Sequence, residues 1–278
     1  MSEFQTIRYE VIDGAIARVT LNRPETRNAQ NQRMTYELNE ALTRASFDDA
    51  VKVIILAGEG PHFSSGHDIR GRDDFEPTRI GISGGIGKPG AEGHMALEEE
   101  IFFHMCRRWQ QLPKPTIAQV HGKTIAGGLM LMWVCDLIVA SEDASFIDIT
   151  VDFGVNGVEW FGHPWEFGIR KAKEMLFTGQ PVTAQEAYNV GMLNHVVPRD
   201  QLADFTLDLA GKIARRPGFS LKLAKLSCNQ ALDAQGFWTA QQAAFNLQHL
   251  GHSDWREQRL RAKVAELEGK DTGAASGG

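Results

Sequence analysis

Cysteine is scarce in this sequence of 278 residues, and the three that occur stand far apart along the chain. Cys106, Cys135 and Cys228 lack the close spacing of metal ligands, and their odd number argues against a disulfide framework. We therefore expect reduced thiols in a cytoplasmic protein, and we expect no metal site.

Blocks of basic residues are also missing. Lys and Arg total 29 against 35 Asp and Glu, which gives a formal net charge of −6. Because affinity for nucleic acid depends on concentrated positive charge, we expect no nucleic-acid partner.

Long apolar runs are the third absence. No run approaches the roughly 18 residues that a membrane-spanning helix needs. Residues 1–6 are polar and lack the charged-then-apolar pattern of a signal peptide. We expect a soluble chain with no membrane partner.

The composition that remains is that of an ordinary globular protein, with 42% hydrophobic and 23% charged residues. Short β-branched apolar runs predict strands, and apolar residues spaced three and four apart predict helices. We expect strands at residues 16–21, 51–57, 116–121 and 136–140, and helices at 31–45, 97–112 and 127–134. Strands that alternate with helices indicate an α/β fold.

The organisation along the chain changes after the last expected strand. We expect an α/β core over residues 1–198 and a helical region over residues 199–268. Residues 269–278 are rich in Gly, Ala and Ser and predict a disordered tail. Glycine-rich residues 72–92 predict a mobile surface loop. Thr183 and Glu186 form a capping-box pattern, and Asp200 is expected to cap the next helix.

Two glycine-containing turns follow buried strands. Residues 63–69 read Phe-Ser-Ser-Gly-His-Asp-Ile, and residues 122–128 read Gly-Lys-Thr-Ile-Ala-Gly-Gly. The second opens a helix, where backbone N–H groups have no intrahelical partner. If the turns face each other, they form an oxyanion hole with two donors aimed at one carbonyl.

Either turn alone is more typical of a structural turn than of a site. Neither turn is a phosphate loop, because the Gly-Lys-Thr of residues 122–124 lacks the glycine that a phosphate loop has five positions earlier, and neither turn contains Gly-x-Gly-x-x-Gly. Their order and context carry more information. From about residue 14 to about residue 225, the sequence resembles the crotonase (enoyl-CoA hydratase/isomerase) superfamily. The matching stretches are residues 21–29, 53–58, 63–69, 113–118, 122–128, 135–136 and 176–198.

The resemblance implies the ββα-spiral fold of that superfamily, with a helical C-terminal assembly region. It also implies an acyl-CoA thioester as substrate, with coenzyme A carried by the substrate and no further cofactor. The thioester oxygen is expected to accept hydrogen bonds from the N–H groups of His67 and Gly127. His67 stands where alanine is usual, and its imidazole either adds a polar group to the pocket or points to solvent.

Further substrate contacts are implied at the same turns. Asp68, Ile69 and Arg70 match the stretch that lines the adenine and phosphates of coenzyme A, and an arginine suits phosphate geometry. Arg27 and Ala29 match the loop that contacts the nucleotide. For both arginines the alternative is a solvated surface charge. The other residues that we expect at the substrate are Ser65, Gly66, Gly128, Met130, Thr150 and Trp160.

The sequence departs from the family at its two glutamates, which activate water and move protons beside the thioester. Counted from Gly127, the first position is Met130. Counted from Phe146, the second is Thr150. Residues 150–168 form a stretch two residues shorter than usual, and counting back from Gly168 gives Asp148 instead.

Glu159 is the favoured replacement acid/base group, and Asp148 is the second choice. For each, the alternative is a surface carboxylate or a helix-end charge. Met130 makes the pocket apolar, and an apolar pocket raises a carboxylate pKa toward neutrality. Trp160 is expected either to close the acyl pocket or to pack in the core.

Two classes of function stay open. The first is an acyl-CoA enzyme of the hydratase/isomerase type, with double-bond isomerisation or β-ketoacyl-CoA hydrolysis by Glu159 or Asp148 as alternatives. The second is a non-catalytic acyl-CoA binding protein on the same fold. The family forms homotrimers, often paired as dimers of trimers, and we expect such assembly here.

Overall fold

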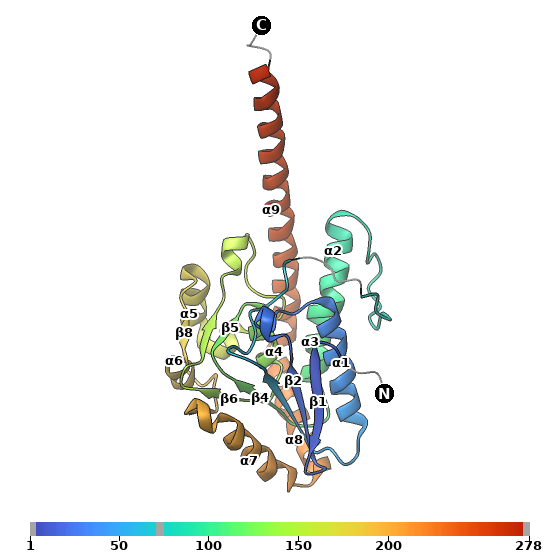
Figure 1. Cartoon of the computed structure of the whole chain (residues 1–278), viewed down its shortest axis with the longest axis vertical. Helices are drawn as coiled ribbons and strands as arrows, with labels where there is room; N and C mark the ends of the chain where they lie inside the picture. Colours follow the sequence, from blue (N-terminus) through green and yellow to red (C-terminus); the bar gives the residue numbers. More distant parts are fainter. Residues whose placement is uncertain (1–3, 71–74, 275–278) are drawn as a thin grey trace.

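The computed structural model describes residues 4–70 and 75–274, with side chains described as far as Lys263 and at Glu266. Its main element is a six-stranded sheet in the order β1-β2-β3-β4-β6-β9 (Figure 1). The first pair is antiparallel and the remaining pairs are parallel. The strands are β1 (Ile7–Ile12), β2 (Ile16–Leu21), β3 (Val53–Gly58), β4 (Thr116–Val120), β6 (Leu137–Ser141) and β9 (His195–Val197).

A second, three-stranded sheet has the order β5-β7-β8. Its strands are β5 (Lys123–Ile125), β7 (Ser145–Ile147) and β8 (Val182–Thr183). β5 leads directly into α4 (Gly127–Trp133), so this small sheet fixes where that helix begins.

Burial on both faces explains why β3 is apolar throughout. Ile54 and Leu56 belong to the larger core, whereas Val53 and Ile55 belong to a second core on the opposite face. A parallel strand covered on both sides needs apolar residues at every position. α7 (Leu202–Ala214) covers the second face, and α1 (Gln32–Phe47) packs on the first.

The remaining helices surround the sheets. They are η1 (Pro24–Thr26), α2 (Gly90–Glu98), η2 (Glu99–His104, a π-helix), α3 (Met105–Gln110), η3 (Thr150–Phe153), α5 (His163–Thr178), α6 (Ala184–Asn189), η4 (Arg199–Gln201), α8 (Gly218–Ala234) and α9 (Phe237–Ala274). None of the helices in the described part of the chain is long and apolar enough to cross a membrane.

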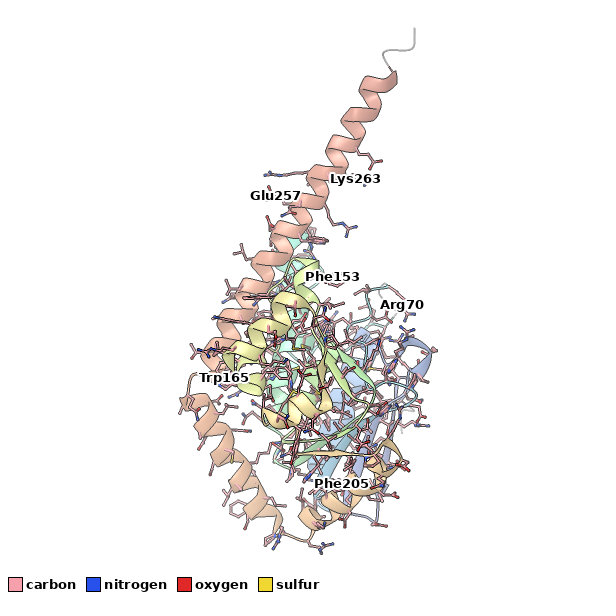
Figure 2. The ribbon with its side chains drawn as sticks, turned by 90° about the vertical axis from the view of Figure 1, so that its left-hand side faces the viewer. Arg70, Phe153, Trp165, Phe205, Glu257 and Lys263 are labelled. Atoms are coloured by element: carbon pink, nitrogen blue, oxygen red, sulfur yellow. The ribbon has the colours of Figure 1, made fainter. Side chains whose placement is uncertain are left out.

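The C-terminal helix α9 packs on the body with its first half and then projects away from it (Figures 1 and 2). Glu257 and Lys263 lie on the projecting part, far from Phe205 at the opposite end of the molecule. Of the tail expected over residues 269–278, residues 269–274 form the end of α9, and residues 275–278 lie outside the described part.

Several expected elements change at their ends. The helix expected from residue 97 begins at Gly90, so the expected loop is shorter. Part of that loop, residues 72–74, lies outside the described residues. The capping box at Thr183 and Glu186 is confirmed. The expected cap at Asp200 is wrong, because Asp200 lies inside η4 and α7 starts only after it.

Candidate active site

The two glycine turns lie against each other, held by short backbone ladders. The N–H of Gln30 donates to the Gly66 carbonyl oxygen, and the N–H of Asp68 donates to the Gln30 carbonyl oxygen, both at 2.8 Å. On the other side, the N–H of Ile125 donates to the Ser64 carbonyl oxygen at 3.0 Å. Residues 63–68 are thereby clamped between the loop after β2 and the strand that leads into α4.

The close approach explains why glycine occupies both turns. Gly66 has a φ of +88°, and a Cβ there would lie 3.1 Å from the Gly127 nitrogen. A Cβ at Gly127 would lie 2.4 Å from Nε2 of His67, whose ring therefore covers this glycine. A Cβ at Gly128 would lie 2.7 Å from the Ser64 carbonyl oxygen.

Backbone strain concentrates at the same place. Ala126, the residue before α4, has φ 45° and ψ −116°. A residue with a Cβ in this region costs about 1–3 kcal/mol, and such strain gathers at functional sites. In the described part of the chain, neither the His67 nor the Gly127 N–H donates a hydrogen bond.

A cavity of about 530 Å³ opens beside these turns. Its wall combines apolar side chains from α2 and η2 with polar groups from the turns and from α9. The sequence-predicted residues that line it are Ser65, His67, Asp68, Ile69, Gly127, Thr150 and Glu159.

Glu159 is buried in this cavity, with 3% of its surface exposed. Its Oε2 lies 3.6 Å from Nε2 of His67. The His67 ring stacks on Phe102 with centroids 3.8 Å apart, so it faces the cavity. Burial raises the pKa of Glu159 to about 7, an effect that His67 opposes and Glu98 reinforces.

Asp148 lies in a different environment, with no exposed surface and outside the cavity lining. Its Oδ2 lies 2.7 Å from Nε2 of the equally buried His163. The N–H and hydroxyl of Thr150 donate to its Oδ1 at 2.8 and 2.6 Å. Burial alone would raise the pKa of Asp148, but the bonds from His163 and Thr150 hold it below its usual range. These contacts are those of a structural carboxylate.

The residues expected at coenzyme A lie on the outer side of the turns. Ile69 is 84% exposed, whereas Ala29 is buried. Arg70 is exposed and its guanidinium forms an ion pair with Asp68 at 2.9 Å. Arg23 approaches the same carboxylate at 3.0 Å. The hydrogen bonds from Arg70 have the largest effect and hold the pKa of Asp68 well below its usual range. Burial would raise this pKa, and the hydrogen bond from Arg23 also lowers it.

Arg27 adopts the left-handed conformation at φ 55° and is exposed. Its carbonyl oxygen accepts from the Ser65 N–H at 2.9 Å, which ties its loop to the first turn. Met130 and Trp160 lie in the core, with 1% and 0% of their surface exposed, and neither lines the cavity. The backbone N–H of Trp160 donates to the Met130 sulfur at 3.4 Å.

Sequence reasoning missed a polar cluster in the cavity wall. His94 and Glu98 come from α2, and His249 and His252 come from α9. Burial raises the pKa of Glu98 to about 8, with Arg256 opposing the effect. Burial also lowers the pKa of His249 and of His252 to about 4. The four-residue spacing of His94 and Glu98 indicates that both lie on one face of a helix. Only the tertiary structure brings them to the histidines of α9.

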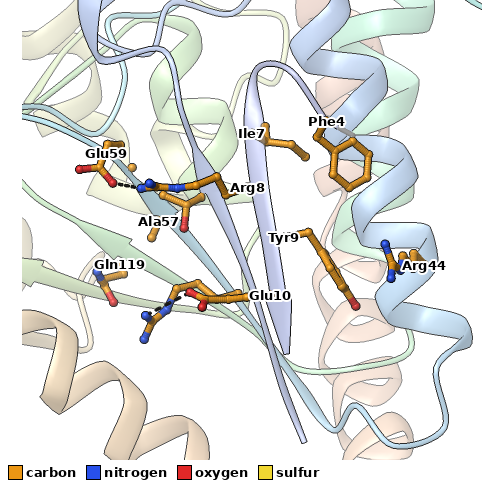
Figure 3. A pocket seen from close by; sticks show the side chains of 12 residues that line it. Phe4, Ile7, Arg8, Tyr9, Glu10, Arg44, Ala57, Glu59 and Gln119 are labelled. Atoms are coloured by element: carbon orange, nitrogen blue, oxygen red, sulfur yellow. Dashed lines mark hydrogen bonds and ion pairs between the residues drawn. The ribbon is translucent and has the colours of Figure 1, made fainter. Parts of the chain in front are cut away.

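Another pocket, of about 670 Å³, lies at β1 and β2 (Figure 3). An Arg8–Glu59 ion pair crosses it, and Arg44 lies over the Tyr9 ring at 4.6 Å. It contains neither glycine turn nor any of the candidate acid/base groups. We therefore place the candidate active site in the cavity beside His67 and Gly127.

Comparisons with known proteins agree with this architecture. The sheets and helices match solved crotonase folds. A crystal structure from Mycobacterium thermoresistibile, described as a probable enoyl-CoA hydratase, is 46% identical with a TM-score of 0.83, covering 91% of this chain and 98% of that one. An enoyl-CoA hydratase/isomerase from Xanthobacter autotrophicus Py2 is 32% identical with a TM-score of 0.80, covering 96% and 99% of the two chains.

The family itself follows from sequence. The family profile described as enoyl-CoA hydratase/isomerase matches residues 11–266. EchA13 of Mycobacterium tuberculosis, whose name is that of a putative enoyl-CoA hydratase, is 46% identical over an alignment of 264 residues that covers 92% of this chain and 83% of that protein. The chain belongs to the enoyl-CoA hydratase/isomerase family of the crotonase superfamily, and the expected fold class is confirmed.

Proposed function

We propose that this chain converts acyl-CoA thioesters through an enolate, held by the N–H groups of His67 and Gly127, with Glu159 as the acid/base group. The placement of Glu159 carries the proposal. Its carboxylate shares one cavity with both glycine turns and lies 3.6 Å from the His67 imidazole. Asp148 lacks this access, so we rank it below Glu159.

The proposed step is a proton transfer along the acyl chain. The Glu159 carboxylate takes a proton from a carbon next to the thioester or next to a double bond, and the C–H electron pair moves into the thioester carbonyl. The resulting oxyanion accepts hydrogen bonds from the two backbone N–H groups. The Glu159 carboxyl then returns the proton to another carbon of the conjugated system. A carboxyl with a pKa near neutrality suits both directions of this transfer.

This chemistry favours isomerisation or proton exchange over hydration. The family's hydration route uses two glutamates, and the corresponding positions here carry Met130 and Thr150. Met130 is a buried thioether that cannot titrate. Hydration and β-ketoacyl-CoA hydrolysis are the competing reactions, because both also pass through an oxyanion.

We further infer that Arg27 and Arg70 meet the phosphates of coenzyme A at the outer rim, and that coenzyme A arrives with the substrate. Arg70 would then exchange its exposed ion pair with Asp68 for a phosphate. The free cysteines support a reducing, cytoplasmic setting.

Assembly into a homotrimer or a dimer of trimers is inferred from uncovered apolar side chains. α8 has no buried residue within this chain, and Phe219 on it is 70% exposed. Leu247 and Leu250 on α9 are 57% and 67% exposed. Contact with neighbouring copies would bury these side chains.

The test is mass spectrometry of acyl-CoA thioesters incubated with the protein in heavy water. The panel contains saturated, 2-enoyl, 3-enoyl and β-ketoacyl thioesters. We expect deuterium uptake beside the thioester and interconversion of 2-enoyl and 3-enoyl forms, both lost in Glu159→Gln. Gain of one water by 2-enoyl-CoA would establish hydration instead. Loss of activity in folded Asp148→Asn, with Glu159→Gln active, would reverse our ranking.

The second candidate is binding without turnover, which the absent glutamates favour. It would be established if every thioester returned unchanged and undeuterated while still binding to the protein.

A further inference from the structure

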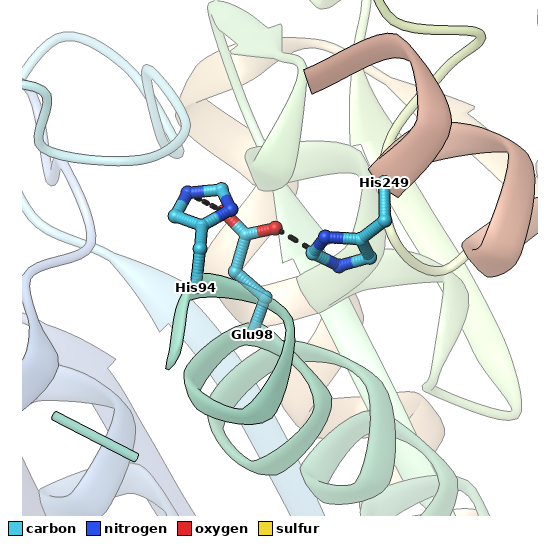
Figure 4. A group of neighbouring side chains, drawn as sticks. All are labelled: His94, Glu98 and His249. Carbon is cyan, nitrogen blue, oxygen red and sulfur yellow. Dashed lines mark ion pairs between the residues drawn. The ribbon is translucent and has the colours of Figure 1, made fainter. Parts of the chain in front are cut away.

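Three histidines and one glutamate meet where α2 packs against α9. His94 and Glu98 lie one turn apart on α2, and His249 and His252 lie on the facing side of α9. Figure 4 shows the His94 and His249 rings on opposite sides of the Glu98 carboxylate, each joined to it by an ion-pair contact.

The distances around this carboxylate are short and similar. Nε2 of His94 lies 3.0 Å from Oε1, and Nε2 of His249 lies 3.4 Å from Oε2. Nε2 of His252 lies 3.6 Å from Oε2. One ligand atom from each of His94, Glu98 and His249 can be chosen so that all three lie within 4.8 Å of one another.

We propose that His94, Glu98 and His249 bind a divalent ion of the zinc type, with the fourth position beside His252 and open to the cavity. Zinc prefers imidazole nitrogen and carboxylate oxygen at about 2.0–2.1 Å in tetrahedral geometry, which places neighbouring ligand atoms about 3.3 Å apart. The contacts of His94 and His249 to the two Glu98 oxygens, at 3.0 and 3.4 Å, are close to this spacing.

The buried polar atoms of the cluster also favour a bound cation. Among the residues that the structure describes, Oε2 of Glu98 and Nε2 of His249 and His252 make no hydrogen bond. Only 8% of the His249 side chain and 12% of the Glu98 side chain are exposed. Buried polar atoms without hydrogen bonds are costly, and a metal ion would satisfy these atoms together.

The charges around the cluster are compatible with a cation. Glu98 and Glu159 line the same cavity, so two buried carboxylates face one enclosed space. The opposing charge is Arg256 on α9, whose guanidinium donates to the Gly90 carbonyl oxygen at 3.4 Å on the exposed side of the helix pair. A bound ion would join α9 to α2 and so fix this wall of the cavity.

The site does not depend on which residue performs acid/base chemistry, and its test measures metal binding directly. Untagged protein is stripped with a chelator and titrated with zinc chloride by calorimetry and by elemental analysis after gel filtration. We expect one zinc per chain. His249→Gln and His94→Gln should each weaken zinc binding at least about 100-fold. Loss of a residue that only supports a ligand typically weakens metal binding about 10- to 100-fold, and loss of the ligand itself should weaken it more.

His104→Gln is the matched control, because His104 lies on the adjoining η2 segment outside the cluster. Cobalt provides a second readout on the unchanged protein: a nitrogen- and oxygen-ligated tetrahedral ion should give visible absorption bands that zinc abolishes. If a variant fails to fold, this competition still decides the question. The proposal is overturned if the native protein binds no zinc at micromolar concentration. It is also overturned if zinc binds the folded His249→Gln variant as tightly as the native chain, since binding would then be adventitious.

Discussion

Replacing Glu159 by glutamine should have opposite effects on activity and stability. Glutamine keeps the size of the side chain but cannot ionise. Burial raises the pKa of the folded Glu159 from 4.5 to about 7. The folded state therefore holds this proton more tightly than the unfolded chain, so the contribution to stability is present below about pH 4.5 and is lost as the pH rises through about 7.

The magnitude follows from the same two values. One pH unit corresponds to 1.36 kcal/mol, so ionising Glu159 in the folded protein costs about 3 kcal/mol. At pH 8.5 we expect Glu159→Gln to be more stable than the native protein by up to that amount. At pH 5 the difference should fall to about 1 kcal/mol, because the folded carboxyl is still protonated and the pH is only slightly above the pKa of the unfolded carboxyl.

Activity should change in the other direction. Loss of a positioned acid/base group typically lowers the rate 10²- to 10⁴-fold. We expect deuterium exchange beside the thioester to fall within this range in Glu159→Gln. In the native protein, kcat/KM for exchange should rise with pH through about 7 and then level off, because removal of the substrate proton needs the ionised carboxylate.

The assay pairs urea unfolding at pH 5 and pH 8.5 with exchange kinetics, at one fixed protein concentration because assembly contributes to stability. Glu166→Gln is the control. Burial also raises the pKa of Glu166 to about 8, yet Glu166 does not line the cavity. The Glu166→Gln variant should exchange deuterium at a rate within about twofold of the native rate, which is small beside the effect of losing a catalytic group. Equal pH dependence of stability in native and Glu159→Gln protein would refute the burial argument, and undiminished exchange would refute the catalytic one.

Three further predictions concern the scaffold. Asp148→Asn should lower the free energy of unfolding by about 3 kcal/mol, because it breaks a buried pair with His163, and unchanged thermal unfolding would contradict this. Gly128→Ala should destabilise by about 1–3 kcal/mol, because its Cβ would meet the Ser64 carbonyl oxygen at 2.7 Å; a stable variant with native exchange kinetics would show that the backbone yields. Analytical ultracentrifugation should give a trimer or hexamer that Leu250→Lys weakens, whereas a monomer at micromolar concentration would rule out assembly through α9.

Local sequence signals located most of the scaffold correctly. The buried strand over residues 51–57 appears as β3, and the helix from residue 31 appears as α1 with Asn31 as its cap. The capping box of Thr183 and Glu186 formed because all its partners lie within one helical turn. Such signals succeed where the stabilising contact is close in sequence.

Signals that depend on distant contacts were weaker. The apolar spacing of residues 97–112 predicted one helix, whereas the helical segment begins at Gly90, where α2 contacts α9, and continues through the π-helical η2, which contacts α1. The short strands β5, β7 and β8 escaped prediction, because two or three residues carry no clear periodicity and pair only in the folded chain. Asp200 failed as a cap because a 3₁₀ turn displaced the start of α7.

The sequence by itself determined the family, the class of fold and the two glycine turns, because these depend on local residue order and on backbone positions that only glycine tolerates. The sequence already favoured Glu159 over Asp148, but only the tertiary structure gave the physical difference between them. Both are buried acidic residues in one short stretch, but Glu159 faces the cavity at His67 while Asp148 is paired with His163. It also brought His94 and Glu98 to His249, across about 150 residues of chain. The pKa of a side chain and its partners depend on what surrounds it in space, which the order of residues does not state.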